Sequence, residues 1–188
     1  MPVSEEFQQP APAIFTWQSY DPAVKVELWS TAITVPGRLY FFDPIPLAES
    51  ALAELCQARS PAAVILTNCN HSRAAAEYSD KFRIPIFSGA DLTEKVAPGL
   101  EIIPIEGGVA GEVAVFQPAT NTLVVGDALI NFEPPGLAFL PKKYCCNEKQ
   151  MQRSLRQLLE IKVRRIFFAH GQPILVRAAE KLQALLEL

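Results

Sequence analysis

The sequence has few of the features that mark secreted, membrane or nucleic-acid-binding proteins. Its four cysteines in 188 residues are too sparse for a disulfide framework. No apolar run approaches the roughly 20 residues that span a bilayer. A net charge of −3 offers no basic surface for nucleic acid or anionic lipid. Residues 1–9 are acidic and polar rather than basic and then apolar, so we expect no signal peptide and a cytoplasmic location.

What the chain does have is the composition of a packed globular protein. Its hydrophobic fraction of 49% and charged fraction of 20% are typical of a folded domain rather than a disordered chain. At 188 residues, the length falls in the range of one domain. We therefore expect residues 1–188 to form a single domain, whose partner is a small molecule or another protein.

Apolar periodicity predicts strands first and then alternating strands and helices. Short apolar or alternating runs predict strands at 14–19, 24–30, 38–42, 62–67, 84–87, 100–106, 113–117, 123–126 and 165–169. Helical spacing of apolar residues predicts helices at 47–55, 71–80, 151–159 and 175–186. Segment 131–146, rich in proline and aromatics, is predicted as a loop that lines a ligand pocket or covers a sheet edge. This order favours an α+β fold with two mixed sheets.

Four segments place polar residues or glycines where predicted strands end. The longest is the run Thr67-Asn68-Cys69-Asn70-His71-Ser72-Arg73, which follows a short apolar strand. The other three are Phe41-Phe42-Asp43, Val124-Val125-Gly126-Asp127 and Phe167-Phe168-Ala169-His170-Gly171. A glycine-rich segment, Glu106-Gly107-Gly108-Val109-Ala110-Gly111, lies between them. Side chains at strand ends converge in many folds, so these segments are the candidate functional positions.

These segments, in this order, resemble the metallo-β-lactamase superfamily over most of the chain. The resemblance implies a four-layer αββα sandwich of two mixed sheets with outer helices, and hydrolysis by metal-activated water. In that family the first loop reads Thr-His-x-His-x-Asp-His and helps to hold two metal ions. Here Asn68 and Asn70 stand at the first two histidines, Ser72 at the aspartate and Arg73 at the last histidine.

The resemblance also assigns positions beyond the first loop. It places Gly108 where the family has a third histidine, Asp127 at the aspartate that bridges the metals, and His170 at the final histidine ligand. The strand ending in Asp43 resembles the one whose aspartate supports the metal loop.

The aligned donors fall short of what two metal ions require. Asparagine amides are poor zinc ligands, and Gly108 offers no side chain. Asp127 and His170 are the competent donors that remain, while the permanent charge of Arg73 would repel a cation. We therefore expect no dinuclear centre and no cofactor, with Asp127 and His170 as the residual candidates for metal binding or catalysis.

Three roles stay open for Asp127 and His170. In the first, an Arg73–Asp127 ion pair replaces the metal, because an unpaired buried carboxylate is costly. In the second, Ser72 or Cys69 acts as a nucleophile beside them in a metal-free triad.

In the third role, a single zinc or similar transition metal is held by Asp127 and His170 with His71 and a cysteine. His71, however, stands at a spacer position of the motif and begins a predicted helix, which favours a capping or surface role.

The leading hypothesis is a non-hydrolytic protein that binds its ligand in the former active-site cleft, with no nucleic-acid or membrane partner. The candidate cleft residues are Asn68, Asn70, His71, Ser72, Arg73, Gly108, Asp127 and His170. The alternative is a hydrolase with an atypical mononuclear or metal-free site around Asp127 and His170.

Overall fold

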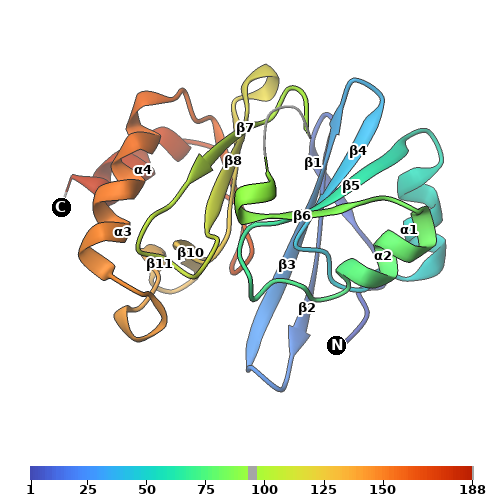
Figure 1. The fold of residues 1–188 in the computed structure, drawn as a ribbon, viewed down its shortest axis with the longest axis horizontal. Helices are drawn as coiled ribbons and strands as arrows, with labels where there is room; N and C mark the ends of the chain where they lie inside the picture. The colour runs from blue at the N-terminus through green and yellow to red at the C-terminus, as the bar shows by residue number, and fades with distance from the viewer. Residues whose placement is uncertain (93–96, 188) are drawn as a thin grey trace. The chain divides into compact units, whose positions relative to one another are not determined.

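The computed structural model describes residues 1–92 and 97–187, whose helices and strands are labelled in Figure 1. The chain divides into two compact units. The N-terminal unit comprises Met1–Leu66 and Asn70–Phe87, and the C-terminal unit comprises Thr67–Cys69 and Ser88–Leu188. The single domain over 1–188 stays a prediction.

The N-terminal unit is built on a mixed sheet with strand order β1-β2-β3-β4-β5-β6. Its strands are β1 (Gln8–Ala11), β2 (Ile14–Asp21), β3 (Val26–Val35), β4 (Arg38–Phe42), β5 (Ser60–Leu66) and β6 (Ile86–Ser88). Strands β1 to β4 pair antiparallel, and β5 runs parallel to β4. The helices are α1 (Glu49–Cys56) and α2 (Ala75–Phe82). Strand β5 ends in five buried residues, the continuous apolar pattern of a strand covered on both faces.

The C-terminal unit contains a second mixed sheet, with strand order β12-β9-β8-β7, and a separate β10-β11 hairpin. The strands are β7 (Glu101–Pro104), β8 (Val113–Gln117), β9 (Thr122–Val125), β10 (Leu129–Phe132), β11 (Gly136–Phe139) and β12 (Arg165–Phe168). The α-helices are α3 (Glu148–Leu155) and α4 (Ala178–Leu186). Short 3-10 helices occur at Gly89–Asp91, Pro118–Thr120, Lys142–Tyr144 and Arg156–Glu160. Strands β7 to β9 pair antiparallel, whereas β12 runs parallel to β9.

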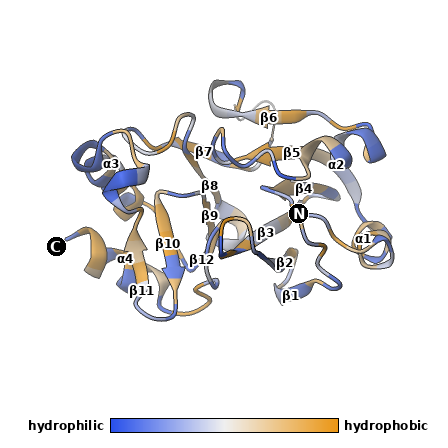
Figure 2. Cartoon of the chain, turned by 90° about the horizontal axis from the view of Figure 1, so that it is seen from below, coloured by the Kyte–Doolittle hydropathy of each residue, from blue (hydrophilic) through white to orange (hydrophobic). Residues whose placement is uncertain are grey.

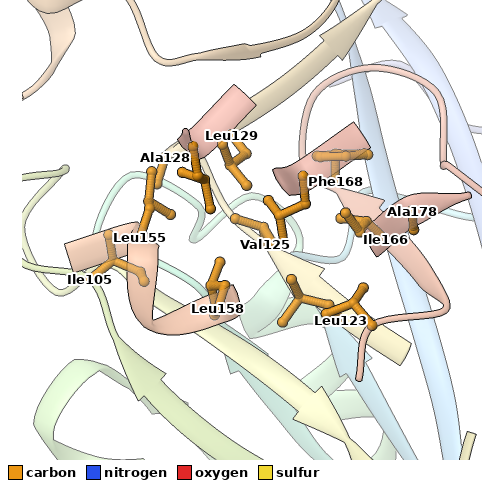
Figure 3. Close-up of a cluster of buried hydrophobic side chains, with 14 of the residues drawn as sticks. Ile105, Leu123, Val125, Ala128, Leu129, Leu155, Leu158, Ile166, Phe168 and Ala178 are labelled. Atoms are coloured by element: carbon orange, nitrogen blue, oxygen red, sulfur yellow. The ribbon is translucent and has the colours of Figure 1, made fainter. Parts of the chain in front are cut away.

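The C-terminal unit has a continuous apolar core, part of which is shown in Figure 3. Leu123 and Val125 of β9 and Ile166 and Phe168 of β12 pack there with Leu155 of α3. Helix α3 contributes its few apolar residues to this core and is otherwise polar, so it is mostly blue in Figure 2, whereas β5 of the other unit is mostly orange. The core thus packs against β9 and β12, which carry the residues that follow each strand.

The structure confirms the α+β fold class with two mixed sheets and corrects several element boundaries. The predicted loop at 131–146 is wrong in part, because it contains the end of β10, all of β11 and one 3-10 turn. Its prolines Pro134 and Pro135 lie in the turn between the two strands, where a missing N–H breaks no ladder bond. Helix α2 begins at Ala75 rather than at residue 71, and α4 begins at Ala178 rather than 175.

Among the described residues, no helix combines the length and the apolar character needed to cross a membrane.

Candidate functional site

The candidate site in the C-terminal unit lies where β9 and β12 end. These two strands run parallel, with Val125 paired to Phe168, and the N–H of Ala169 donates to the carbonyl of Val125 at 3.1 Å. Asp127 and His170 each follow two residues after that last pair. Parallel neighbouring strands deliver their following residues to one edge of a sheet, which explains why these two side chains meet.

Two further segments reach the same edge of the sheet. Strand β8 runs antiparallel to β9 and starts at Val113, so Glu112 lies beside the end of β9. The N–H of Val113 donates to the carbonyl of Thr67 at 2.8 Å, and the N–H of Cys69 donates to the carbonyl of Ala110 at 3.0 Å. These two bonds attach the segment Thr67–Cys69 to the C-terminal unit and place Asn68 at the site.

Asn68 joins two buried carboxylates. Its Nδ2 donates to Oε2 of Glu112 at 2.9 Å and to Oδ2 of Asp127 at 3.1 Å. The other oxygen of Glu112, Oε1, accepts from the N–H of Ala128 at 3.0 Å. Asn68, Glu112 and Asp127 are 0%, 3% and 8% exposed. A primary amide carries two N–H donors, so one asparagine can serve both carboxylates.

Glycines make room for this arrangement. A Cβ at Gly108 would lie 3.1 Å from Cγ of Glu112, so the Glu112 side chain fills the space that a side chain at position 108 would take. A Cβ at Gly126 would overlap Oγ1 of Thr67 and would lie 2.7 Å from Oε1 of Glu112. Gly126 therefore leaves the space that Thr67 and Glu112 occupy, and a side chain at position 108 would press on Glu112.

Asp127 also faces His170. Nε2 of His170 lies 3.2 Å from Oδ1 of Asp127. At this distance one proton between the nitrogen and the carboxylate oxygen forms a hydrogen bond, whereas a bare nitrogen and an ionised carboxylate are both acceptors and would repel each other. With zinc–ligand bonds of about 2.0–2.1 Å, two ligands of a tetrahedral ion lie about 3.3 Å apart, so the spacing also fits a shared metal.

The N-terminal unit holds a second cluster, centred on Asp43 at the end of β4. Nδ1 of His71 lies 3.0 Å from Oδ2 of Asp43, and both side chains are buried. Nη1 of Arg73 donates to the carbonyls of Trp29 at 2.8 Å and Asp43 at 3.0 Å. Ser30 Oγ also donates to the Asp43 carbonyl, at 2.8 Å. Asp43 therefore supports the loop after β5, as the resemblance implies.

Strained backbone marks the same cluster. Asp43 and Arg73 have φ angles of 46° and 32°, in the left-handed region that non-glycine residues seldom adopt. Such conformations persist where surrounding bonds over-determine them, and functional sites are common examples.

The structure therefore sorts the predicted cleft residues by unit. Asn68, Gly108, Asp127 and His170 come together in the C-terminal unit. The remaining four, Asn70, His71, Ser72 and Arg73, belong to the N-terminal unit. The Arg73–Asp127 pair and the triads with Ser72 or Cys69 stay predictions.

The structure corrects the predicted role of His71 and adds Glu112 to the residues of the site. His71 is not a capping or surface residue, because it is 3% exposed and lies against Asp43 ahead of α2. Glu112 was missed, although one signal was available: it is a charged residue directly before the fully apolar strand start Val113-Ala114-Val115. Charged side chains are seldom buried without a partner, so that position calls for a specific hydrogen-bond network.

Comparison with known proteins identifies the fold. Residues 8–188 match the family model of the metallo-beta-lactamase superfamily. The DIM-1 metallo-beta-lactamase exposed to ceftazidime superposes with a TM-score of 0.75 at 14% identity, covering 100% of this chain and 99% of that one. A metallo-beta-lactamase from Erythrobacter litoralis with beta mercaptoethanol in its active site gives a TM-score of 0.74 at 13% identity, covering 96% and 95%.

A third solved structure is the FIM-1 metallo-beta-lactamase from Pseudomonas aeruginosa in its mono-zinc form. It superposes with a TM-score of 0.72 at 13% identity, covering 98% of this chain and 96% of that one. No curated protein matches the sequence.

Proposed function

The chain belongs to the metallo-β-lactamase superfamily, and we propose that it is a non-hydrolytic member that lacks the dinuclear metal centre. It binds a small molecule or a protein at the former active-site region, in the cytoplasm and without nucleic-acid or membrane partners. The observation that carries this proposal is the pair of hydrogen bonds from the Asn68 amide to Glu112 and Asp127.

That pair of bonds fits a role for Asn68 as a hydrogen-bond donor rather than as a metal ligand. Nδ2 of Asn68 directs its hydrogens at the two carboxylates, and the ligand atom that an asparagine could offer, Oδ1, is a poor zinc ligand. The space above Gly108 holds the Glu112 side chain instead of a histidine. In this proposal, the hydrogen bonds from Asn68 to Glu112 and Asp127 take the place of the family's metal–imidazole bonds.

A second candidate function is supported by the spacing of Asp127 and His170. Their donor atoms are 3.2 Å apart, which suits two ligands of one ion, and carboxylate and imidazole are good zinc ligands. A single bound zinc would supply an activated water for hydrolysis. Under this alternative, Asp127 and His170 hold the ion, and His71 and a cysteine are the further donors that the sequence predicts.

Elemental analysis of untagged protein separates the two functions. We expect only trace zinc, manganese and iron after incubation with each metal and removal of the excess. The Asp127→Ala/His170→Ala double variant gives the background, and Asp80→Ala, which alters an exposed residue of α2, is the matched control. A near-stoichiometric metal that is present in the Asp80→Ala control and lost in the double variant would overturn the proposal and establish the mononuclear site.

A further inference from the structure

We infer that Asn131 is a positioning residue that holds the loop carrying His170, so that the imidazole faces Asp127. The inference rests on the proposed function in one respect: it takes Asp127 and His170 to lie in the region that binds the ligand. It adds a residue from β10, outside the segments that resemble the family's metal ligands.

Asn131 stands at a position where the strand pattern calls for an apolar side chain. In β10, Leu129 and Asn131 are buried while Ile130 and Phe132 are half-buried. Asn131 is only 4% exposed, and asparagine is disfavoured in strands. A buried amide there costs free energy unless it is hydrogen-bonded, so its partners indicate why it is present.

Those partners belong to the loop that follows β12. The backbone N–H of Asn131 donates to the carbonyl of His170 at 3.1 Å, and the N–H of Gln172 donates to the carbonyl of Asn131 at 2.9 Å. The side-chain Nδ2 donates to the carbonyl of Gln172 at 2.6 Å. Asn131 thus fixes the chain on both sides of Gly171.

Gly171 is the complementary half of this contact. It has a φ angle of 94° and forms a bridge with Asn131, and a Cβ there would overlap the backbone carbonyl of Asn131. The same strand also begins two residues after Asp127. One element, β10, therefore fixes both members of the pair: its start follows Asp127 and its third residue binds the loop of His170.

The test uses the fact that the chain has only two histidines. Long-range proton–nitrogen spectra of the imidazoles are recorded on chelator-treated protein, and His71→Gln identifies the His170 signals. We expect wild-type His170 to populate a single tautomer with its proton on Nε2, facing Asp127. In Asn131→Leu, which has the same branching but no donor, we expect the Nδ1 and Nε2 signals to move toward each other as the tautomers exchange.

Two further variants test the same contact. Asn131→Asp has the same shape and also lacks the amide donor, and it replaces Asn131→Leu if that variant does not fold. Gly171→Ala disturbs the contact between Gly171 and Asn131 from the side of the loop. The matched control is Asn147→Ala, which removes the side-chain cap of α3, where Asn147 accepts from the N–H of Gln150 at 3.2 Å. We expect it to lower the melting temperature without moving the His170 signals.

Unchanged His170 signals in the folded Asn131 variants would overturn the inference, as would an equal change in Asn147→Ala. The experiment is independent of the metal assay. It is performed without metal and reports only on the imidazole, whereas metal content decides the proposed function whatever the role of Asn131.

Discussion

The chain contains two aspartate–histidine pairs, one in each compact unit, and they differ in what surrounds them. In the N-terminal unit, Asp43 and His71 lie 3.0 Å apart, with side chains 3% and 4% exposed. In the C-terminal unit, Asp127 and His170 lie 3.2 Å apart, with side chains 12% and 17% exposed. The first pair, called the sealed pair below, is almost completely buried, and the backbone of Asp43 accepts further hydrogen bonds from Ser30 and Arg73. The second pair, called the accessible pair, is more exposed to solvent, and Asp127 lies beside the carboxylate of Glu112.

The two pairs differ in what the aspartate of each contacts. The Asp43 carbonyl also accepts hydrogen bonds from Ser30 and Arg73, so the whole residue anchors a loop. The Asp127 carboxylate shares the Asn68 amide with Glu112, which places two negative groups around one donor. Two carboxylates that are both ionised in one buried site oppose each other, so this arrangement contributes less to stability than a single carboxylate with the same donor would.

The largest effect is expected at the sealed pair. Asp43→Ala removes the partner of the buried His71 and leaves a non-glycine residue at a φ of 46°, so we expect a loss of about 3 kcal/mol in the free energy of unfolding. Urea unfolding followed by circular dichroism measures it. Asp43→Asn, which tolerates the left-handed backbone, should lose less. A loss no greater than that of the exposed control Asp80→Ala would show that Asp43 does not anchor the loop.

A somewhat smaller effect is expected at Glu112. Glu112→Gln keeps the volume but turns an amide donor toward Asn68 or Ala128, both of which already donate, so we expect a loss of about 2 kcal/mol. The exposed Glu101→Gln in β7 is the matched control, and the same urea titration compares the two. Equal stability of both variants would mean that Glu112 is protonated or replaceable, and that the bridge from Asn68 does not hold the site together.

Of the three buried carboxylates Asp43, Glu112 and Asp127, we expect Asp127 to contribute least to the free energy of unfolding. Asp127→Asn removes one of two neighbouring carboxylates, but it turns an amide donor toward Nδ2 of Asn68 when its oxygen faces His170. These two effects oppose each other, so we expect a net change within about 1 kcal/mol of wild type. Such a result, next to a large loss at Asp43, would support a functional rather than structural role for Asp127. A loss as large as that of Asp43→Ala would erase the distinction between the two pairs.

Much of this arrangement could be predicted from the sequence, for definite physical reasons. Asp127 and His170 each follow a short apolar strand, and the ends of neighbouring strands bring such residues together. The support that Asp43 gives to the loop after β5 was implied by the resemblance of the strand that ends in Asp43 to the family's. The replaced ligands Asn68 and Gly108 predict that no metal binds at the first position, because the asparagine amide is a poor zinc ligand and glycine offers no side chain, and this stays a prediction.

Other features could not be predicted because they depend on contacts distant in sequence. Glu112 meets Asn68 across 44 residues, through the pairing of β8 with the segment after β5, which periodicity does not report. Asn131 lies in a segment whose prolines suggested a loop, and its partner Gln172 is 41 residues away. The burial of His71 follows from its contact with Asp43 rather than from its position ahead of a helix. In each case a polar residue is buried by a tertiary hydrogen bond that local sequence patterns cannot anticipate.

Among the charged contacts compared for their contribution to stability, we expect the smallest effect at an exposed ion pair. Nζ of Lys81 lies 2.9 Å from Oε1 of Glu49, with side chains 43% and 87% exposed, and this contact lowers the pKa of Glu49 below its usual value. A lowered carboxylate pKa stabilises the fold above the usual pKa, and this contribution is lost as the pH falls through the lowered one. We therefore expect Lys81→Met to be slightly less stable than wild type at pH 7, with a melting temperature almost unchanged, and equal to it once Glu49 is protonated. Thermal melts of both proteins at neutral and acidic pH measure the difference. A decrease comparable to that of Glu112→Gln would mean that surface charge, rather than burial, sets the ranking of these pairs.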